Sequence, residues 1–157
     1  MGDDTGDELE PFAAWRAVLL AQSRAVRAIE RELVAAGQIS LMWYDVLLEL
    51  NAADDRSLRM QDLALKAVLS RTRVSRVVSE LQDAELVERL ADSDDGRATL
   101  ARITSKGRHA LKRAAPVYLE GIERHFTRHL TPREQQAIIS GLQRVISAHG
   151  AETDPRR

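Results

Sequence analysis

Apolar side chains recur every three or four residues along most of this chain, which is the spacing of one face of an α-helix. The pattern is longest near the two ends of the sequence, where it predicts helices over residues 10–36, 105–130 and 132–150. The three apolar stripes consist of Phe12, Trp15, Leu19, Val26, Ile29 and Leu33, then Leu111, Ala115, Tyr118, Ile122 and Phe126, and finally Ile138, Leu142, Val145 and Ile146.

The ends of these helices carry their own signals. Gly37 is suited to end the first helix, because glycine adopts the left-handed backbone conformation without strain. Pro116 should kink the second, since proline lacks the N–H donor. The third begins with Thr131-Pro132-Arg133-Glu134, a typical capping sequence. A helix as long as the first, with apolar positions along its whole length, usually packs on several other elements or on another subunit.

The middle of the chain predicts shorter elements. Residues 41–51 follow a capping Ser40 and are apolar nearly all round, so this helix should be central to the fold. Residues 58–60 predict a short strand. Residues 61–68 predict a short helix with Leu63, Ala64 and Val68 facing inward. Residues 85–90 and 99–104 predict two strands of a hairpin around a polar tip at residues 91–97.

Residues 69–84, LSRTRVSRVVSELQDA, predict the helix around which the chain is organised. Its apolar stripe consists of Val74, Val77, Val78 and Leu81. Its other side is polar and basic, and Ser70 is a natural N-cap. Arginine forks and small hydroxyl groups at the start of a helix suit the major groove of DNA. An ordinary amphipathic surface helix would show the same pattern, so the flanking elements matter.

The distribution of charge changes the picture more than the net charge of −1 does. Residues 1–55 hold 4 basic and 11 acidic side chains, whereas residues 56–113 hold 13 basic and 8 acidic ones. A basic segment inside a neutral-to-acidic protein is typical of a module that binds a polyanion, although a chance fluctuation would also give an excess this small. Helix, tight turn, helix and hairpin follow one another here, which is the order of a winged helix-turn-helix.

The hairpin tip carries Asp95 and Arg97. An arginine at the tip of such a wing can enter the narrow, negatively charged minor groove. Asp95 is placed to orient that guanidinium through a charge-assisted hydrogen bond. The alternative is a solvated pair of turn residues that contributes little.

From Pro11 to Gly150 the sequence resembles the MarR (multiple antibiotic resistance regulator) family of transcription factors. The most specific part is DGRATLARITSKG at residues 95–107, similar to the family's wing signature of Asp-x-Arg and a strand ending in Leu-Thr-x-x-Gly. Ala101 and Ile103 stand where the family prefers Val and Leu. Residues 69–89 and 43–47 resemble the recognition helix with the first wing strand, and the family's second helix. Glu85 stands where a glycine is usual, which should not remove the turn.

The resemblance implies a single mainly α domain over residues 1–157 with a small β-hairpin. Residues 9–37 and 105–150 would be dimerisation helices, and residues 38–104 the DNA-binding lobe. The implied function is a cytoplasmic, homodimeric transcriptional regulator of a pseudo-palindromic operator, a repressor released by a small aromatic or phenolic ligand. The implied DNA contacts are Ser70, Arg71, Thr72, Arg73, Ser75, Arg76 and Arg97, and the implied ligand pocket involves Trp15, Met42, Trp43 and Tyr44. Plain core packing is the alternative for these aromatic residues.

Other chemistry finds less support. His125 and His129 are four residues apart on a predicted helix, a spacing that can hold a metal, but paired surface or interface histidines explain them as well. The chain has no cysteine, so disulfides are excluded. We expect no metal, no cofactor, no membrane span and no enzymatic activity, because no nucleophile–base set or phosphate-binding loop stands out. A winged-helix module for protein contacts and a ligand-independent regulator remain alternatives.

Overall fold

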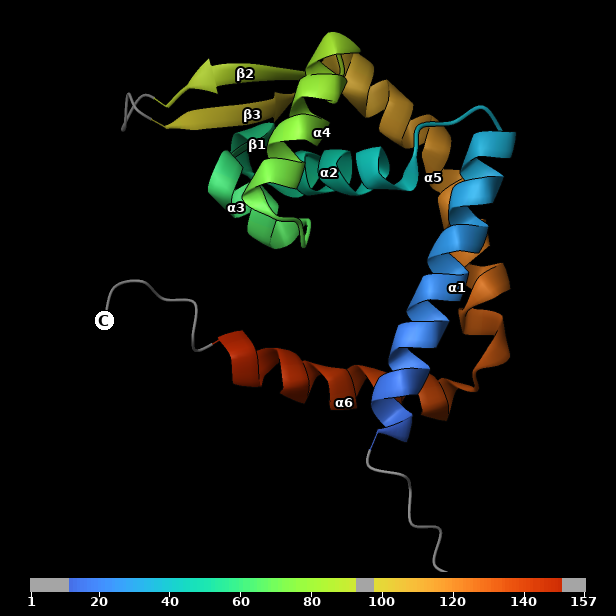
Figure 1. The fold of residues 1–157 in the computed structure, drawn as a ribbon. Coiled ribbons are helices and arrows are strands. Elements are labelled where there is room, and N and C mark those ends of the chain that lie inside the picture. Colours follow the sequence, from blue (N-terminus) through green and yellow to red (C-terminus); the bar gives the residue numbers. More distant parts are fainter. Residues whose placement is uncertain (1–11, 93–97, 151–157) are drawn as a thin grey trace, which may run out of the picture.

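The computed structural model describes residues 12–92 and 98–150. These residues form a mainly helical fold with one small sheet, so the predicted fold class is confirmed (Figure 1). The elements in chain order are α1 (Ala13–Ala35), α2 (Leu41–Ala52), η1 (Asp54–Arg56), β1 (Ser57–Arg59), α3 (Met60–Lys66), α4 (Arg71–Asp83), β2 (Val87–Ala91), β3 (Thr99–Ile103), α5 (Ser105–His125), η2 (Thr127–His129) and α6 (Pro132–Gly150).

The sheet is antiparallel, with β3 between β1 and β2. Leu58 pairs with Ala101 on one side of β3, and Arg89 pairs with the same residue on the other side. The hairpin predicted from sequence is therefore joined by the short strand that precedes α3. This third strand ties the wing to the helix-turn-helix and covers one edge of β3.

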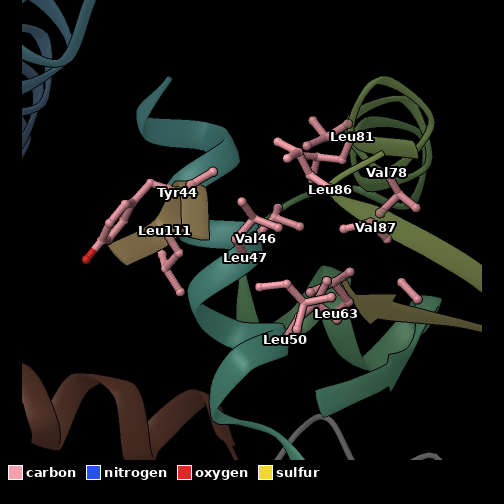
Figure 2. Packing of buried hydrophobic residues seen from close by; sticks show 14 of the residues in the cluster. Tyr44, Val46, Leu47, Leu50, Leu63, Val78, Leu81, Leu86, Val87 and Leu111 are labelled. Carbon is pink, nitrogen blue, oxygen red and sulfur yellow. The ribbon is translucent and has the colours of Figure 1, made fainter. Parts of the chain in front are cut away.

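The core lies where α2, α3, α4 and the sheet meet (Figure 2). Leu47, Leu50 and Leu63 are completely buried. Val78 and Leu81, from the apolar stripe of α4, are equally buried and belong to the same cluster. The nearly apolar sequence of α2 is explained by its position, because α1, α3, α4, α5 and the sheet all contact it. The expectation that this helix is central is confirmed.

The caps behave as the sequence predicts. Ser40 accepts a hydrogen bond from the backbone N–H of Trp43, and Gly37 takes the left-handed conformation with φ 64° at the end of α1. Thr131 and Glu134 exchange hydrogen bonds at the start of α6, which also lowers the pKa of the Glu134 carboxyl.

Three details of the prediction are wrong. Val68 does not face inward: its side chain is 89% exposed, because a tight turn with φ 55° follows the last residue of α3. The helix that begins at Ser105 ends at His125 rather than near residue 130. The strand predicted over residues 85–90 begins at Val87 as β2, because Glu85 adopts φ 62° and makes the turn that a glycine would make.

The end helices leave apolar surface uncovered in a single chain. α1 packs along α5, whereas α6 projects away from this pair (Figure 1). The exposed apolar side chains of α1 and α6 include Trp15, Leu19, Leu20, Ile139, Val145 and Ile146. Exposed apolar faces of this extent are unusual on a monomeric protein and mark an interaction surface.

Candidate nucleic-acid interface

Helix α4 presents its polar face to solvent. Ser70 caps it by accepting from the backbone N–H of Arg73 at 3.2 Å, as predicted. Val74, Val77, Val78 and Leu81 hold the helix against the core. The polar side chains at the start of the helix, from Arg71 to Arg76, are exposed. The capped N-terminus therefore offers backbone N–H groups and guanidinium groups on the same surface.

The predicted DNA contacts lie on the two flanks of α4. A groove of about 420 Å³ on one flank is lined by Ser70, Thr72, Arg73 and Arg76. A second groove, of about 320 Å³, is lined by Arg71 and Ser75 together with Arg59, Gln61 and Thr99 from β1, α3 and β3. The structure thus brings together the six predicted residues of the helix, and adds neighbours on the wing side.

Within residues 12–92 and 98–150, the three arginines of α4 have no acidic partner. No ion pair with another described residue involves Arg71, Arg73 or Arg76. A guanidinium group without an acidic partner can form charge-assisted hydrogen bonds to a phosphate or to a guanine edge, and these bonds offset the free-energy cost of removing it from water. This face of α4 is therefore chemically suited to a polyanion.

Arg89 is a residue whose role the sequence did not reveal. From β2 it donates to the backbone oxygen of Ser75 at 3.1 Å, to the Ser79 hydroxyl at 3.0 Å and to the Gln82 side chain at 3.3 Å. These bonds tie α4 to strand β2 of the hairpin. The sequence shows only that an arginine lies within a predicted strand. It does not reveal the partners of Arg89, because these lie 7 to 14 residues away along the chain.

Arg59 and Asp92 form a second link that the sequence analysis missed. The Nε atom of Arg59 lies 2.6 Å from a carboxylate oxygen of Asp92, whose side chain is only 7% exposed. The pair joins β1 to the residue that follows β2, at the loop end of the hairpin and away from the end that connects to α4 and α5. The predicted wing residues Asp95 and Arg97 lie outside the described residues.

A cavity of about 630 Å³ lies between α1, α2 and α4, behind the recognition helix. Of the four residues predicted to line a ligand pocket, Met42 and Trp43 line this cavity. Tyr44 instead is buried against Tyr118, with ring centroids 4.3 Å apart. Trp15 is 63% exposed on α1 and does not line the cavity. The four side chains therefore do not form one site.

Two interactions give this cavity its chemistry. The indole N–H of Trp43 donates to Glu80 on α4 at 3.3 Å, so the cavity wall is connected to the recognition helix. Asp45 also lines the cavity, and burial together with the neighbouring charge of Glu49 raises its pKa to about 6.

The two histidines do not share one helix, because α5 ends at His125 and His129 lies in η2. His125 Nε2 lies 2.8 Å from Glu32, and His129 Nε2 lies 3.1 Å from the backbone oxygen of Arg124. The His125 and Arg124 contacts lower the pKa of the Glu32 carboxyl. Among the described residues, no group of three or more metal-binding side chains is arranged to hold an ion.

No helix in the described ranges combines the length and apolar character needed to cross a bilayer.

Comparison with known proteins agrees with the family resemblance of the sequence. Residues 37–98 match the model of the MarR family. No curated protein matches the chain.

Three solved structures of similar proteins cover most of the chain. AbsC, a MarR family transcriptional regulator from Streptomyces coelicolor, is 25% identical with a TM-score of 0.80, over 88% of this chain and 93% of that one. Sco3205, from the same organism and in complex with DNA, is 29% identical with a TM-score of 0.77, over 87% and 84%. A MarR family regulator from Silicibacter pomeroyi is 27% identical with a TM-score of 0.70, over 86% and 88%.

Proposed function

We propose that the chain is a transcriptional regulator of the MarR family, a homodimeric, sequence-specific repressor released by a small ligand, since residues 37–98 match the family model and similar solved structures are MarR family transcriptional regulators. The observation that carries the proposal is the capped start of α4, where Arg71, Arg73 and Arg76 are exposed and free of ion pairs with the described residues. A regulator of this family has no catalytic role, and we assign none here. Binding to chromosomal DNA goes with a cytoplasmic location.

The proposed dimer is formed by the end helices. Residues 9–37 and 105–150 would supply it, and residues 38–104 would form the DNA-binding lobe of the single domain 1–157. The exposed apolar faces of α1 and α6 support this division, since pairing two copies would remove them from water. Two lobes held at a set distance would read two half-sites about one helical turn apart, that is, a pseudo-palindrome.

The proposed contacts divide by chemistry. Arg71, Arg73 and Arg76 would bind guanine edges and phosphates, while Ser70, Thr72 and Ser75 allow close approach of the helix to the groove. Arg97, oriented by Asp95, is proposed for the minor groove on the sequence alone. Sco3205, which is similar over most of this chain, was determined in complex with DNA, and this supports the assignment.

Release by a ligand needs a link between the ligand site and α4. The cavity behind the helix supports such a link, because Glu80 of α4 and Trp43 of α2 both line it and are hydrogen-bonded to each other. A ligand seated there, a small aromatic or phenolic compound, would compete with this bond and favour a different position of α4. The ligand then shifts the protein between two states of unequal DNA affinity.

The test is fluorescence anisotropy with a labelled duplex from the region upstream of the protein's own coding sequence. We expect saturable, salt-sensitive binding. Arg73→Ala should weaken it at least about threefold, since each lost phosphate contact lowers affinity and the salt slope. Arg128→Ala, an equally exposed arginine of η2, is the matched control and should bind like the original protein.

The outcomes separate the alternatives. Absence of preference for any duplex over random polyanion would refute the regulator. Unchanged binding after substitution of all three α4 arginines would favour a winged-helix module for protein contacts. Sequence-specific binding that no small molecule weakens would leave a ligand-independent regulator.

A further inference from the structure

The cavity between α1, α2 and α4 has apolar and aromatic walls with charged groups set into them. Met42, Trp43 and Leu69 give it surface for a flat, apolar ring. Its volume of about 630 Å³ is within the range of sites that hold small ligands. The charged groups therefore decide which ring-bearing compounds fit.

The carboxylates of the cavity are unequally engaged. Glu30 accepts from the backbone N–H of Leu41 at 2.7 Å, and Glu80 accepts from the Trp43 indole at 3.3 Å. Asp45 makes no hydrogen bond or ion pair with any described residue. A half-buried carboxylate without a partner is costly to keep ionised, and it gains most from a ligand that brings a charged donor.

The groups around Asp45 leave it as a negative site. Glu49, one turn further along α2, adds a like charge. Burial raises the pKa of Tyr44 and of Tyr118, and the nearby charge of Asp45 raises both further. Arg27 and Arg31 of α1 also line the cavity, but both are exposed, and the ion pairs of the described residues include none between either arginine and Asp45. The two arginines therefore do not neutralise the aspartate.

We propose that this cavity takes an aromatic compound that carries a protonated amine, with the ring against Trp43 and Met42 and the amine donating to Asp45. This proposal rests on the proposed function, because it names the chemical class of the regulatory ligand. An anionic aromatic acid, held by Arg27 and Arg31 at the rim, is the competing class and becomes an outcome of the test.

Two probes with the same ring separate the classes: tryptamine, which is a cation at neutral pH, and indole-3-acetate, which is an anion. Both are titrated calorimetrically into the full-length protein without DNA at pH 7.5. We expect tryptamine to bind at least about tenfold more tightly, the value of one charge-assisted hydrogen bond. Asp45→Asn should lower tryptamine affinity by about tenfold and should not weaken indole-3-acetate.

Two controls make the result specific. Asp54→Asn removes an exposed carboxylate in η1, outside the cavity, and should leave tryptamine affinity unchanged. In the unsubstituted protein, tryptamine affinity should fall as the pH drops below about 6, where Asp45 is protonated, whereas Asp45→Asn should show no such fall. The pH series needs no variant, so it tests the proposal even if a substitution disturbs the fold.

Equal tryptamine affinity of the original protein and Asp45→Asn would overturn the proposal. Tighter binding of indole-3-acetate than of tryptamine would overturn it in favour of an anion site, and so would a lack of tryptamine binding at millimolar concentration. The titration is independent of DNA. If tryptamine binds through Asp45 but does not reduce operator binding, the ligand class stands and release by ligand fails.

Discussion

Gly107 lies where the start of α5 touches the wing, and replacing it with alanine tests how tightly this junction is built. A Cβ atom at Gly107 would lie 2.2 Å from the backbone oxygen of Leu86 and 2.8 Å from Cγ1 of Ile103. The same Leu86 oxygen accepts the backbone N–H of Thr104 at 3.0 Å. Thr104 in turn caps α5 by accepting from the N–H of Gly107 and donates to the oxygen of Glu85 at 2.8 Å. The alanine methyl therefore has no room unless this hydrogen-bonded corner opens.

The expected cost follows from two opposing effects. Overpacking of this kind costs about 1–3 kcal/mol, and weakening the Thr104–Leu86 hydrogen bond adds about 0.5–1.5 kcal/mol. Replacing a helical glycine by alanine returns about 0.5–1 kcal/mol. We expect a net loss of about 2 kcal/mol in the free energy of unfolding, since the first two effects exceed the third.

Two other helical glycines are matched controls for the same substitution. Gly121 would place its Cβ 3.1 Å from Ile29 Cγ1, a side-chain atom that can move, so Gly121→Ala should be nearly neutral. Within one chain, Gly141 has nothing within 4 Å of the built Cβ, so Gly141→Ala adds no intrachain clash and should stabilise by about 0.5–1 kcal/mol. The series should therefore rank by the space around each built atom.

The assay is urea unfolding at one fixed protein concentration, because the stability of the proposed dimer would depend on concentration. The reasoning is refuted if Gly107→Ala is as stable as the original protein. It is also refuted if Gly141→Ala is destabilised as much as Gly107→Ala, since the local contact would then not explain the effect.

Three further results are expected. Asp45→Asn should be more stable than the original protein at pH 7–8, because the raised pKa of Asp45 in the folded state means that its ionised form lowers stability. The difference in stability should shrink as the pH falls through 6 toward 4, and chemical denaturation that shows the same difference at every pH would contradict this. Arg89→Gln should lower operator affinity by about tenfold, and Arg89→Lys should have an intermediate effect, since the guanidinium bonds that align α4 are lost. Circular dichroism should show that both variants are folded, and unchanged affinity would exclude this role for Arg89. Val68→Gly should raise the melting temperature by about 2–4 °C, because φ 55° strains a β-branched residue and the exposed Val68 side chain contributes little buried surface. A lower melting temperature would show that contacts of the Val68 side chain outweigh this strain.

The elements that sequence predicted well depend on interactions within a few residues. Ser70 caps α4 through an N–H three residues away, and Thr131 and Glu134 form a capping box over the same distance. The valine stripe of α4 follows from helical periodicity alone. The six proposed contacts lie near one another for the same reason, since they belong to the N-cap and the first turns of a single helix.

Boundaries and turns were predicted less well, because competing contacts set them. The periodic pattern continues past His125, but the helix ends there and the chain turns through η2 before α6. Val68 continues the apolar pattern of α3, yet it lies in the turn that places α4 across the core. Periodicity reports which residues are apolar and carries no information on where the chain must change direction.

Local pattern was therefore enough to predict the elements of the winged helix-turn-helix, their order and the basic face of α4, because each helix and strand is signalled by spacing along its own segment. The folded arrangement was needed to find the bonds of Arg89 to α4, the pairing of Arg59 with Asp92 and the separation of Trp15 and Tyr44 from Met42 and Trp43. The half-buried position of Asp45 beside the cavity, without an ion pair to any described residue, also became visible only in the folded arrangement. These features join residues that are distant in the chain, and their energies depend on burial and distance, which exist only once the helices have packed.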